Sequence, residues 1–453
     1  MNKQTPVINL RESDAGQSSD DHAGVPGTSG IVEWFSVTRH IRPGHAALVF
    51  LIGAAILCTS CAALSSRVIS DPAPSAARLR AGGSLQAEAD LLAQPLIDSG
   101  EACGMVVGVV CPDGVARTYG YGRTGRSGDR RPPGGDTIFQ IGSVSKLFVD
   151  ALLARLVEEG QLNYQDTVRS ILPAKVPLSA DAGELTLYEL VTNTGGLPRQ
   201  PNNLRQMWYF MSFLFTGRNL YGCITKEYLY DYLRACRLPP KAERGYNYSN
   251  IGIGLLTHLI EIKTGRSISD LIAEKICRPL NLRDTVLCLN AEQKSRLAVG
   301  HPGNQPKFMP RSAVMGPWDM GEILSGSCGL YSTANDLIVF TRANLGQLHH
   351  PLEPLLISMQ DVRVKTPRED VGLGWSVNYF NEGRLAITYK HAMVSGYCSY
   401  VGLNVERQVG VVVLCNNFNW HDKVGHNLLL RLSDAYPPRR EPQGSIPLWR
   451  SPE

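Results

Sequence analysis

Hydrophobic and polar positions divide the chain into a polar start, one uncharged apolar run and a long mixed region. Residues 1–42 are mostly polar, rich in Gly, Ser and Asp at first, and have no clear period, which is typical of a disordered tail. The run from Ala46 to Leu64 has 19 residues and no charge. A helix of that length can cross a hydrocarbon core of ~30 Å, so this run predicts a contact with the membrane.

The residues around the apolar run indicate export. Arg39 and Arg42 precede the run. One interpretation of residues 43–66 is a membrane anchor that leaves the rest of the chain outside the cytoplasm. The other is a signal peptide, including the lipoprotein type, because Cys61 follows small residues. Both interpretations predict an exported or membrane-anchored protein on the extracytoplasmic (periplasmic) side, and the sequence leaves the choice between them open.

Composition separates a globular region from two loose ends. Residues 67–84 include the Pro/Ala-rich stretch DPAPSAARLR and are interpreted as a linker. Residues 85–432 carry the periodic patterns of strands and helices, which predicts one globular domain. Residues 433–453 are Pro-rich and are expected to form a loose tail.

The periods in the globular region predict strands near both of its ends and helices between them. An apolar run at Met105–Val110, a Pro-Asp-Gly turn and an alternating stretch to Tyr121 predict a β-hairpin. Three more strands are expected at Ala386–Tyr389, Tyr397–Leu403 and Val409–Leu414. Strands from both ends suggest one antiparallel sheet with a helical lobe beside it. The fold class is therefore α/β of the α+β type, with a site expected in the cleft between the lobes.

Composition narrows the class of protein. The 453 residues are 43% hydrophobic and 19% charged, which excludes a disordered chain. Only one segment is apolar enough to span a bilayer, which excludes a polytopic membrane protein. The net charge of +4, from 45 basic and 41 acidic residues, argues against a nucleic-acid binder, which usually carries a clustered basic patch.

Cysteine and histidine spacing gives no metal site. Cys58 and Cys61 lie in the apolar run, and the other nine of the 11 cysteines form no CxxC pair and no zinc-like spacing. Cys223 and Cys236 could form a disulfide in an exported chain, and buried free thiols are an equal alternative. The ten histidines include no HExxH cluster, so a metal hydrolase is not expected.

The first motif with chemistry is Ser143-Val144-Ser145-Lys146. Apolar residues at helical spacing follow it, and Gly160 is placed to end that helix. Lys146 therefore lies one turn beyond Ser143, on the same face. An amine beside a hydroxyl supplies the proton acceptor that a serine nucleophile needs, and the start of the helix offers N–H groups to an oxyanion. The alternative is an ordinary helix-capping Ser with an exposed Lys.

The second motif is the run Tyr246-Asn247-Tyr248-Ser249-Asn250. Tyr248 and Asn250 are two residues apart, so in an extended segment they point the same way. A phenol beside ammonium groups can act as a base, and the amide can bind a substrate carbonyl. The alternative is a turn before a helix with Asn250 near its N-cap, and both interpretations can hold together.

Two lysines are candidates for the third motif. Lys263-Thr264-Gly265 ends an amphipathic helical pattern that begins near Ile251, so Gly265 is interpreted as a C-cap and Lys263 as a cation of the last turn. The segment from Lys390 to Tyr397 instead lies at the end of one predicted strand and before the next. An edge strand there would offer its backbone to a peptide-like substrate. The second candidate is therefore favoured.

Taken together, these motifs resemble the class C β-lactamase and low-molecular-weight penicillin-binding protein family. The resemblance covers about residues 85–430 and is closest to the D-alanyl-D-alanine carboxypeptidase/endopeptidase branch. It extends to further segments of the chain: FQIGSVSKLF, TNTGGLP, GGLPRQP, GYNYSNIGIGLL, ICRPLNLRDT, SGSCGLYSTANDL, VGLGW and GVVVLCNN. The resemblance implies a β-lactamase/transpeptidase-like fold, with an antiparallel sheet flanked by helices and a helical lobe.

The resemblance also implies roles for single residues. Ser143 matches the acyl-forming nucleophile, Lys146 its base partner, Tyr248 the acid–base tyrosine and Asn250 a ligand of the substrate amide. Lys390 matches the Lys of the family's K-T-G. The backbone N–H groups of Ser143 and Met393 would form the oxyanion hole.

The chain departs from the family beside Lys390. His391 replaces the usual Thr or Ser, and Ala392 replaces Gly. A protonated His391 could bind the substrate carboxylate in place of the missing hydroxyl. The alternative is that His391 points away into the sheet. In an alternative register His391 begins an H-x-G variant with Met393 at the Gly position, but the spacing to Gly396 favours Lys390.

These observations predict a serine hydrolase that acts through an acyl-enzyme on Ser143. The expected substrate is a D-Ala-D-Ala peptide of peptidoglycan, with β-lactams as mimics, and no cofactor is expected. Two alternatives stay open. One is a β-lactamase or an esterase that uses the same site, and the other is a penicillin-binding or degenerate protein that acylates without turnover.

Overall fold

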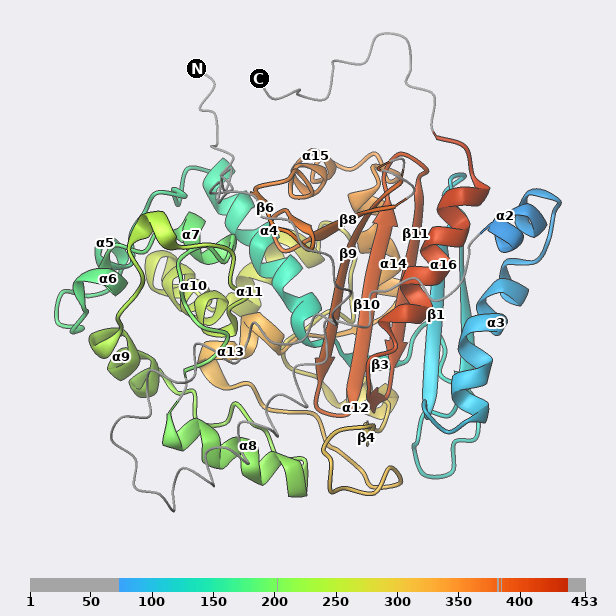
Figure 1. The fold of residues 1–453 in the computed structure, drawn as a ribbon, viewed down its shortest axis with the longest axis horizontal. Helices are drawn as coiled ribbons and strands as arrows, with labels where there is room; N and C mark the ends of the chain where they lie inside the picture. The colour runs from blue at the N-terminus through green and yellow to red at the C-terminus, as the bar shows by residue number, and fades with distance from the viewer. Residues whose placement is uncertain (1–72, 202, 381–382, 384, 439–453) are drawn as a thin grey trace, which may run out of the picture. The chain divides into compact units, whose positions relative to one another are not determined.

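A computed structural model of the chain describes residues 73–201, 203–380, 383 and 385–438 (Figure 1). The expected polar tail at 1–42, the apolar segment at 43–66 and residues 439–453 of the C-terminal tail lie outside these residues. Within the described part of the chain, no helix combines the length and the apolar character needed to cross a membrane.

An eight-stranded sheet forms the centre of the described region, in the order β2-β1-β11-β10-β9-β8-β7-β6 (Figure 1). Each pairing of adjacent strands in this sheet is antiparallel. Strand β1, from the start of the domain, pairs with β11, from its end, so the two ends of the domain close one sheet, as the hydrophobic pattern predicts. The strands are β1 (Gly104–Val110), β2 (Ala116–Gly122), β6 (Val364–Lys365), β7 (Asp370–Val371), β8 (Ser376–Phe380), β9 (Leu385–Val394), β10 (Tyr397–Asn404) and β11 (Val409–Cys415).

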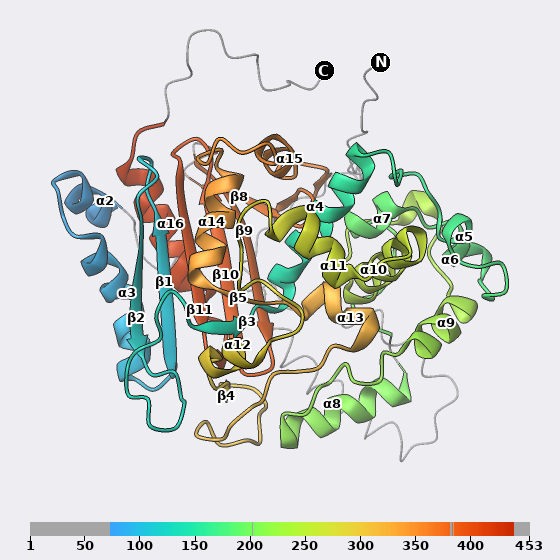
Figure 2. The same cartoon turned by 180° about the vertical axis from the view of Figure 1, so that it is seen from behind.

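Strand β1 is buried along its whole length because both faces of the sheet are covered. Successive side chains of a strand point to opposite faces. Val106 and Val110 accordingly join one hydrophobic core, while Met105, Val107 and Val109 join another. Helices α3 (Leu85–Asp98) and α16 (Asp422–Ala435) pack on one face, and α14 (Ala334–Asn344) packs on the other, which Figures 1 and 2 show from opposite sides.

The helical lobe is inserted between the strands of the sheet. Helices α4 (Ser145–Glu158), α10 (Asn250–Thr264) and α13 (Gly321–Cys328) pack against one another at its centre (Figure 2). The smaller elements around them and along the connections are η4 (Gly142–Val144), α5 (Val168–Ile171), α6 (Ala180–Gly183), α7 (Leu187–Val191), α8 (Leu204–Thr216), α9 (Lys226–Ala235), η5 (Lys241–Glu243), α11 (Ile268–Ile272), η6 (Ala273–Cys277), α12 (Ala291–Arg296) and α15 (Glu353–Ser358), with the short pairs β3 (Ile138–Gln140)–β5 (Tyr331–Thr333) and β4 (His301–Pro302)–β12 (Asn417–Phe418).

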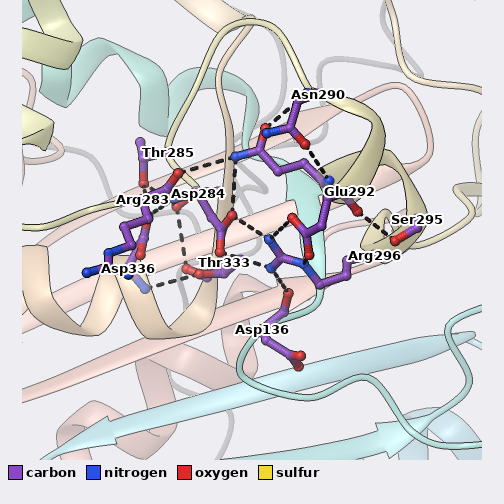
Figure 3. Close-up of polar contacts among 12 residues, drawn as sticks. Asp136, Arg283, Asp284, Thr285, Asn290, Glu292, Ser295, Arg296, Thr333 and Asp336 are labelled. Atoms are coloured by element: carbon purple, nitrogen blue, oxygen red, sulfur yellow. Dashed lines mark hydrogen bonds and ion pairs between the residues drawn. The ribbon is translucent and has the colours of Figure 1, made fainter.

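A polar cluster ties the segment before α12 to the start of α14 (Figure 3). Arg296 donates two hydrogen bonds to the carboxylate of Asp284, at 2.6 and 2.9 Å. Asp336 accepts from the Thr285 hydroxyl and from the Asp284 backbone N–H, both at 2.8 Å. The acids of this cluster are held by internal partners, so we interpret the cluster as structural. The described residues contain no group of His, Cys, Asp and Glu that could hold a metal ion.

The sequence predicted the strands well and the start of the domain less well. The five expected strands match β1, β2, β9, β10 and β11, although β9 continues five residues beyond the predicted end at Tyr389. The segment interpreted as a linker contains helix α2 (Ala73–Arg80), which packs against α16. Cys223 and Cys236 are buried free thiols, so the disulfide that the sequence left open is absent.

Candidate active site

Ser143 lies in η4, directly before helix α4. Gly142 has a φ of +52°, and a Cβ there would lie 3.0 Å from Val394 Cγ1 and 3.2 Å from Ala392 Cβ of strand β9. Glycine at this position therefore permits both the left-handed turn and the close approach to β9. The turn places the half-buried Ser143 beside the strand that carries Lys390.

Lys146 is buried and points at Ser143. Its Nζ donates to Ser143 Oγ at 3.0 Å, to Asn250 Oδ1 at 2.9 Å and to the Ser327 carbonyl at 2.9 Å. Only 1% of the residue is exposed. A buried lysine with its three donors satisfied has a fixed position, so the alternative of a capping Ser with an exposed Lys is wrong.

Tyr248 reaches Ser143 from the loop before α10. Its hydroxyl donates to Ser143 Oγ at 2.7 Å. The loop is held by Asn193, whose carbonyl and side-chain oxygens accept from the N–H groups of Asn247 (2.8 Å) and Ser249 (2.9 Å). Ser249 then caps α10, since its Oγ accepts from Gly252 N at 2.9 Å. The expected turn before a helix therefore occurs, and it places the Tyr248 hydroxyl against Ser143.

Asn250 is the first residue of α10 rather than part of an extended segment. Its Oδ1 accepts from Lys146, and its Nδ2 donates to the Tyr221 hydroxyl at 3.3 Å. In this arrangement the amide of Asn250 holds the lysine in place. Tyr221 contributes to the same hydrogen-bond chain, and the sequence did not single it out.

Three cations surround the ring of Tyr248. Lys146 Nζ lies 5.1 Å from the ring centroid, Lys390 Nζ lies 5.2 Å from it, and the guanidinium carbon of Arg199 lies 5.4 Å from it. Burial and the neighbouring thiol of Cys328 act to raise the pKa of Tyr248, but the ammonium groups of Lys146 and Lys390 outweigh them and lower the pKa below its usual value. The neighbouring cations therefore make Tyr248 more acidic than an ordinary phenol.

The pKa of Lys146 shifts in the opposite direction. Burial acts to lower the pKa of its amine, but the thiol of Cys328 and the phenol of Tyr248 beside it raise the pKa above the usual value. Lys146 is therefore held as an ammonium. The lowered pKa of Tyr248 and the raised pKa of Lys146 favour Tyr248 over Lys146 as the group that accepts a proton from Ser143.

Strand β9 has a free edge next to the site. Strand β8 pairs with β9 only from Leu385 to Tyr389, whereas β10 pairs with it as far as Val394. Within the described sheet, the segment from Lys390 to Val394 therefore has a neighbour on one side only. Lys263 is exposed in the last turn of α10, which Gly265 ends with a φ of +67°. Lys390, and not Lys263, is the lysine that lies at Tyr248.

The two other predicted residues of β9 lie differently. The ring of His391 packs 4.9 Å from that of Trp420 and 5.7 Å from that of Tyr389, centroid to centroid. Because side chains alternate along a strand, His391 points to the face opposite Lys390, and the structure does not bring it into the cluster around Ser143. Met393 lies between Ala392 and Val394, the two residues that contact the position of Gly142.

Besides Tyr221, the sequence did not single out three further groups around the cluster. Cys328 Sγ lies 3.5 Å from Lys146 Nζ and 3.7 Å from Ser143 Oγ. Arg199 is exposed above Tyr248. Asp150 is buried one turn after Lys146. The first two occur in segments that carry the family resemblance, SGSCGLYSTANDL and GGLPRQP, but nothing local in those segments indicates a contact with Ser143.

Comparisons with known proteins give a family match and two relatives of named activity. Residues 89–435 match the Beta-lactamase family. The chain is 26% identical over 330 residues to the D-alanyl-D-alanine-carboxypeptidase/endopeptidase AmpH of Escherichia coli K12, which covers 69% of this chain and 79% of AmpH. It is 25% identical over 332 residues to esterase EstB of Burkholderia gladioli, covering 67% of this chain and 83% of EstB.

A solved structure shows the same fold. The class C β-lactamase of Rhodobacter sphaeroides superimposes with a TM-score of 0.63 and 25% sequence identity, covering 76% of this chain and 98% of that chain. The antiparallel sheet flanked by helices, with its helical lobe, is therefore the fold that the sequence predicted.

Proposed function

The chain belongs to the β-lactamase family, and on that premise we propose that it is a serine hydrolase of the D-alanyl-D-alanine carboxypeptidase/endopeptidase type, acting through an acyl-enzyme on Ser143. One observation carries the proposal: Lys146 Nζ and the Tyr248 hydroxyl converge on Ser143 Oγ, at 3.0 and 2.7 Å. A serine hydroxyl is a weak nucleophile until a neighbouring group takes its proton. The site has such a group in hydrogen-bond contact.

Acylation would begin at Tyr248. Its phenolate, stabilised by the surrounding cations, accepts the proton of Ser143 as Oγ attacks the substrate carbonyl carbon. Lys146 remains an ammonium that orients Oγ and stabilises the phenolate. Tyr248 then gives the proton to the leaving amine, and the same group activates water to release the acyl chain. The backbone N–H groups of Ser143 and Met393 are the proposed donors to the oxyanion.

A peptide substrate would lie along the free edge of β9. Hydrogen bonds from the segment Lys390–Val394 would add the peptide to the sheet as a further strand. The peptide's C-terminal carboxylate would then meet the cations at Tyr248. Arg199 is exposed there, whereas Lys390 is 8% exposed. We therefore assign the direct ionic contact with the substrate carboxylate to Arg199. The 26% identity to AmpH supports this substrate class.

The proposal also assigns a place of action. A D-Ala-D-Ala peptide of peptidoglycan lies outside the cytoplasmic membrane. The apolar segment predicted at residues 43–66 would bring the catalytic domain, proposed at residues 85–432, to that side by export or anchoring.

A second candidate uses the same residues on a different carbonyl. The likeness to a class C β-lactamase over 98% of that chain and the match to esterase EstB favour a β-lactam or an ester as the substrate. A protein that forms the acyl-enzyme without releasing it is the remaining alternative. The three cases share Ser143 and differ in which substrate turns over.

A substrate panel tests the proposal. Turnover of a D-Ala-D-Ala peptide, nitrocefin and a p-nitrophenyl ester is measured for the wild type, Ser143→Ala and the control Lys263→Ala. We expect the peptide to have the highest kcat/KM, Ser143→Ala to lose ~10³-fold or more, and Lys263→Ala to match the wild type. A burst of one acyl group per chain without steady turnover would favour the alternative that the protein forms the acyl-enzyme without releasing it. Near-wild-type activity of Ser143→Ala would overturn the proposal.

A further inference from the structure

Cys328 belongs to the same cluster of reactive side chains as Ser143. It is the last residue of α13, is 5% exposed, and has its Sγ 3.5 Å from Lys146 Nζ and 3.7 Å from Ser143 Oγ. Ser327 Oγ at 3.6 Å and Asn250 Oδ1 at 4.0 Å complete its polar contacts. The thiol therefore lies against the proposed nucleophile, Ser143, and against Lys146, the cation that orients it.

The contact with Lys146 sets Cys328 apart from the other buried thiols. Burial raises the pKa of Cys111, Cys223, Cys236 and Cys277, and among the described residues no cation forms a hydrogen bond with any of these four thiols. Burial acts the same way on Cys328, but the ammonium of Lys146 outweighs it and lowers the pKa of this thiol. A thiolate is the nucleophilic form of cysteine, and a neighbouring cation favours it.

From this geometry we infer that Cys328 is a second nucleophile of the active site, where hydrogen peroxide and small thiol-directed electrophiles modify this protein. Reaction at Sγ requires that a small reagent pass Ser143, the half-buried residue whose Oγ lies 3.7 Å from Sγ. The modification itself does not depend on the proposed function. Its consequence, loss of acylation at Ser143, does rest on it.

The reaction with peroxide is a two-electron transfer. The thiolate attacks one oxygen of HOOH, a bond forms between sulfur and that oxygen, and the O–O bond breaks. Sulfur is oxidised to the sulfenic acid Cys–SOH, and the other oxygen leaves as hydroxide. Because Sγ and Ser143 Oγ are only 3.7 Å apart, the added oxygen would have to displace Oγ from its position, and it would compete for the hydrogen bonds of Lys146. We therefore expect the modified protein to lose acylation until a thiol reductant restores Cys328.

The test follows both the modification and its consequence. The full chain is treated with hydrogen peroxide and dimedone, and the dimedone adduct is mapped by mass spectrometry. In parallel, acylation by a fluorescent penicillin is measured before treatment, after it and after added dithiothreitol. Cys328→Ala and Cys328→Ser are each compared with their own untreated acylation, and the exposed cysteine gives the matched control Cys288→Ser.

We expect the adduct on Cys328 and a fall of ~10-fold or more in acylation that dithiothreitol reverses, as for a low-pKa thiol. Acylation of Cys288→Ser should still fall after peroxide treatment, whereas acylation of the folded Cys328 variants should not. An adduct on Cys288 with none on Cys328, or equal sensitivity in the Cys328 variants, would overturn the inference. If untreated protein does not bind penicillin, the proposed function fails instead, while the adduct map still decides the reactivity of Cys328.

Discussion

Asp150 is a buried carboxyl that the proposed reaction does not use. It lies one turn beyond Lys146 in α4, is 1% exposed, and neither carboxyl oxygen has a hydrogen-bond partner. A Cβ at position 374 would lie 2.5 Å from its Oδ2, so Gly374 leaves room for it. Burial raises the pKa of Asp150 to about 7, against the opposing effect of Lys390 and Lys146.

The raised pKa gives a stability change with a defined sign. An acid whose pKa is higher in the folded state stabilises the fold at low pH, and this stability is lost as the pH rises from ~4 to ~7. Asp150→Asn should remove the loss, so the variant should be the more stable protein at pH 8, by up to about 4 kcal/mol at 1.36 kcal/mol per pKa unit. Urea unfolding at pH 5 and pH 8 measures the difference. Equal pH slopes in both proteins would refute the assignment.

Arg199 is the residue to which we assign the substrate carboxylate. Arg199→Ala should lower kcat/KM about 10–100-fold for a substrate with a free C-terminal carboxylate, the size expected for a charged hydrogen bond of ~1.5–3 kcal/mol. It should change kcat/KM much less for the matching C-terminal amide. Arg205→Ala is the control, since Arg205 lies 5.6 Å from the ring of Tyr228 and not at Tyr248. An equal loss on both substrates would instead assign Arg199 to the electrostatics of Tyr248.

The residues that the sequence identified are those whose spacing is itself informative. Ser143 and Lys146 are one helical turn apart, so local geometry predicts their contact. Cys328 meets Ser143 across 185 residues, and only the packing of α13 on α4 brings them together. His391 shows the converse, because strand alternation was sufficient to place it opposite Lys390. Its expected role in binding a carboxylate came from the family resemblance, whereas the alternative that it points away into the sheet agrees with the alternation.

At the scale of elements, the two candidate lysines lie in different secondary-structure elements. Lys390 lies in a strand beside Tyr248, whereas Lys263 lies in the exposed last turn of α10. Lys390→Ala should therefore cost at least ~10-fold in kcat/KM, because the phenolate loses a neighbouring cation. Lys263→Ala should leave kcat/KM unchanged. Kinetics of the two variants on one substrate compare them directly, and the reverse ranking would contradict the assignment of the third motif.

The sequence located strand β9 but not its length. Its apolar residues predicted an end at Tyr389, since Lys390 and His391 interrupt the pattern. The strand continues to Val394 because β10 supplies hydrogen-bond partners as far as that residue. Tertiary pairing thus overrides the local pattern. The free edge of β9 could not be predicted either, because it depends on where β8 begins.

At the scale of the molecule, the two ends of the domain meet through a buried ion pair. Glu88 of α3 accepts from Arg431 of α16 at 3.1 Å and from Arg78 of α2 at 2.8 Å. The Glu88 side chain is 3% exposed and that of Arg431 is 9% exposed. This contact ties the start of the domain, including the helix in the segment interpreted as a linker, to its last helix.

Removing Glu88 should therefore destabilise the whole domain. Glu88→Ala leaves the buried Arg431 without its carboxylate, which typically costs about 3–5 kcal/mol of unfolding free energy. Glu158→Ala is the control: its pair with Arg155 is 57% exposed on the glutamate side, and such surface pairs contribute ~1 kcal/mol or less. Thermal unfolding of both variants checks the ranking. Equal melting temperatures would show that α2, α3 and α16 do not depend on this contact.

The closure of the sheet was the most predictable feature of the whole molecule. Early and late strands with helices between them leave few other ways to bury the apolar faces of the strands. The place of α2 was not predictable, since the Pro/Ala-rich composition of its segment resembles a linker and its packing against α16 depends on residues more than three hundred positions away.

The central claim is that Ser143 forms an acyl-enzyme, and intact-protein mass spectrometry with a penicillin tests it most directly. We expect one adduct with the mass of the whole penicillin per chain, located by peptide mapping to the segment that contains Ser143 and absent from Ser143→Ala. The adduct should form more slowly in Tyr248→Phe, which cannot accept the proton. An adduct on any other residue, or one that persists in Ser143→Ala, would contradict the claim.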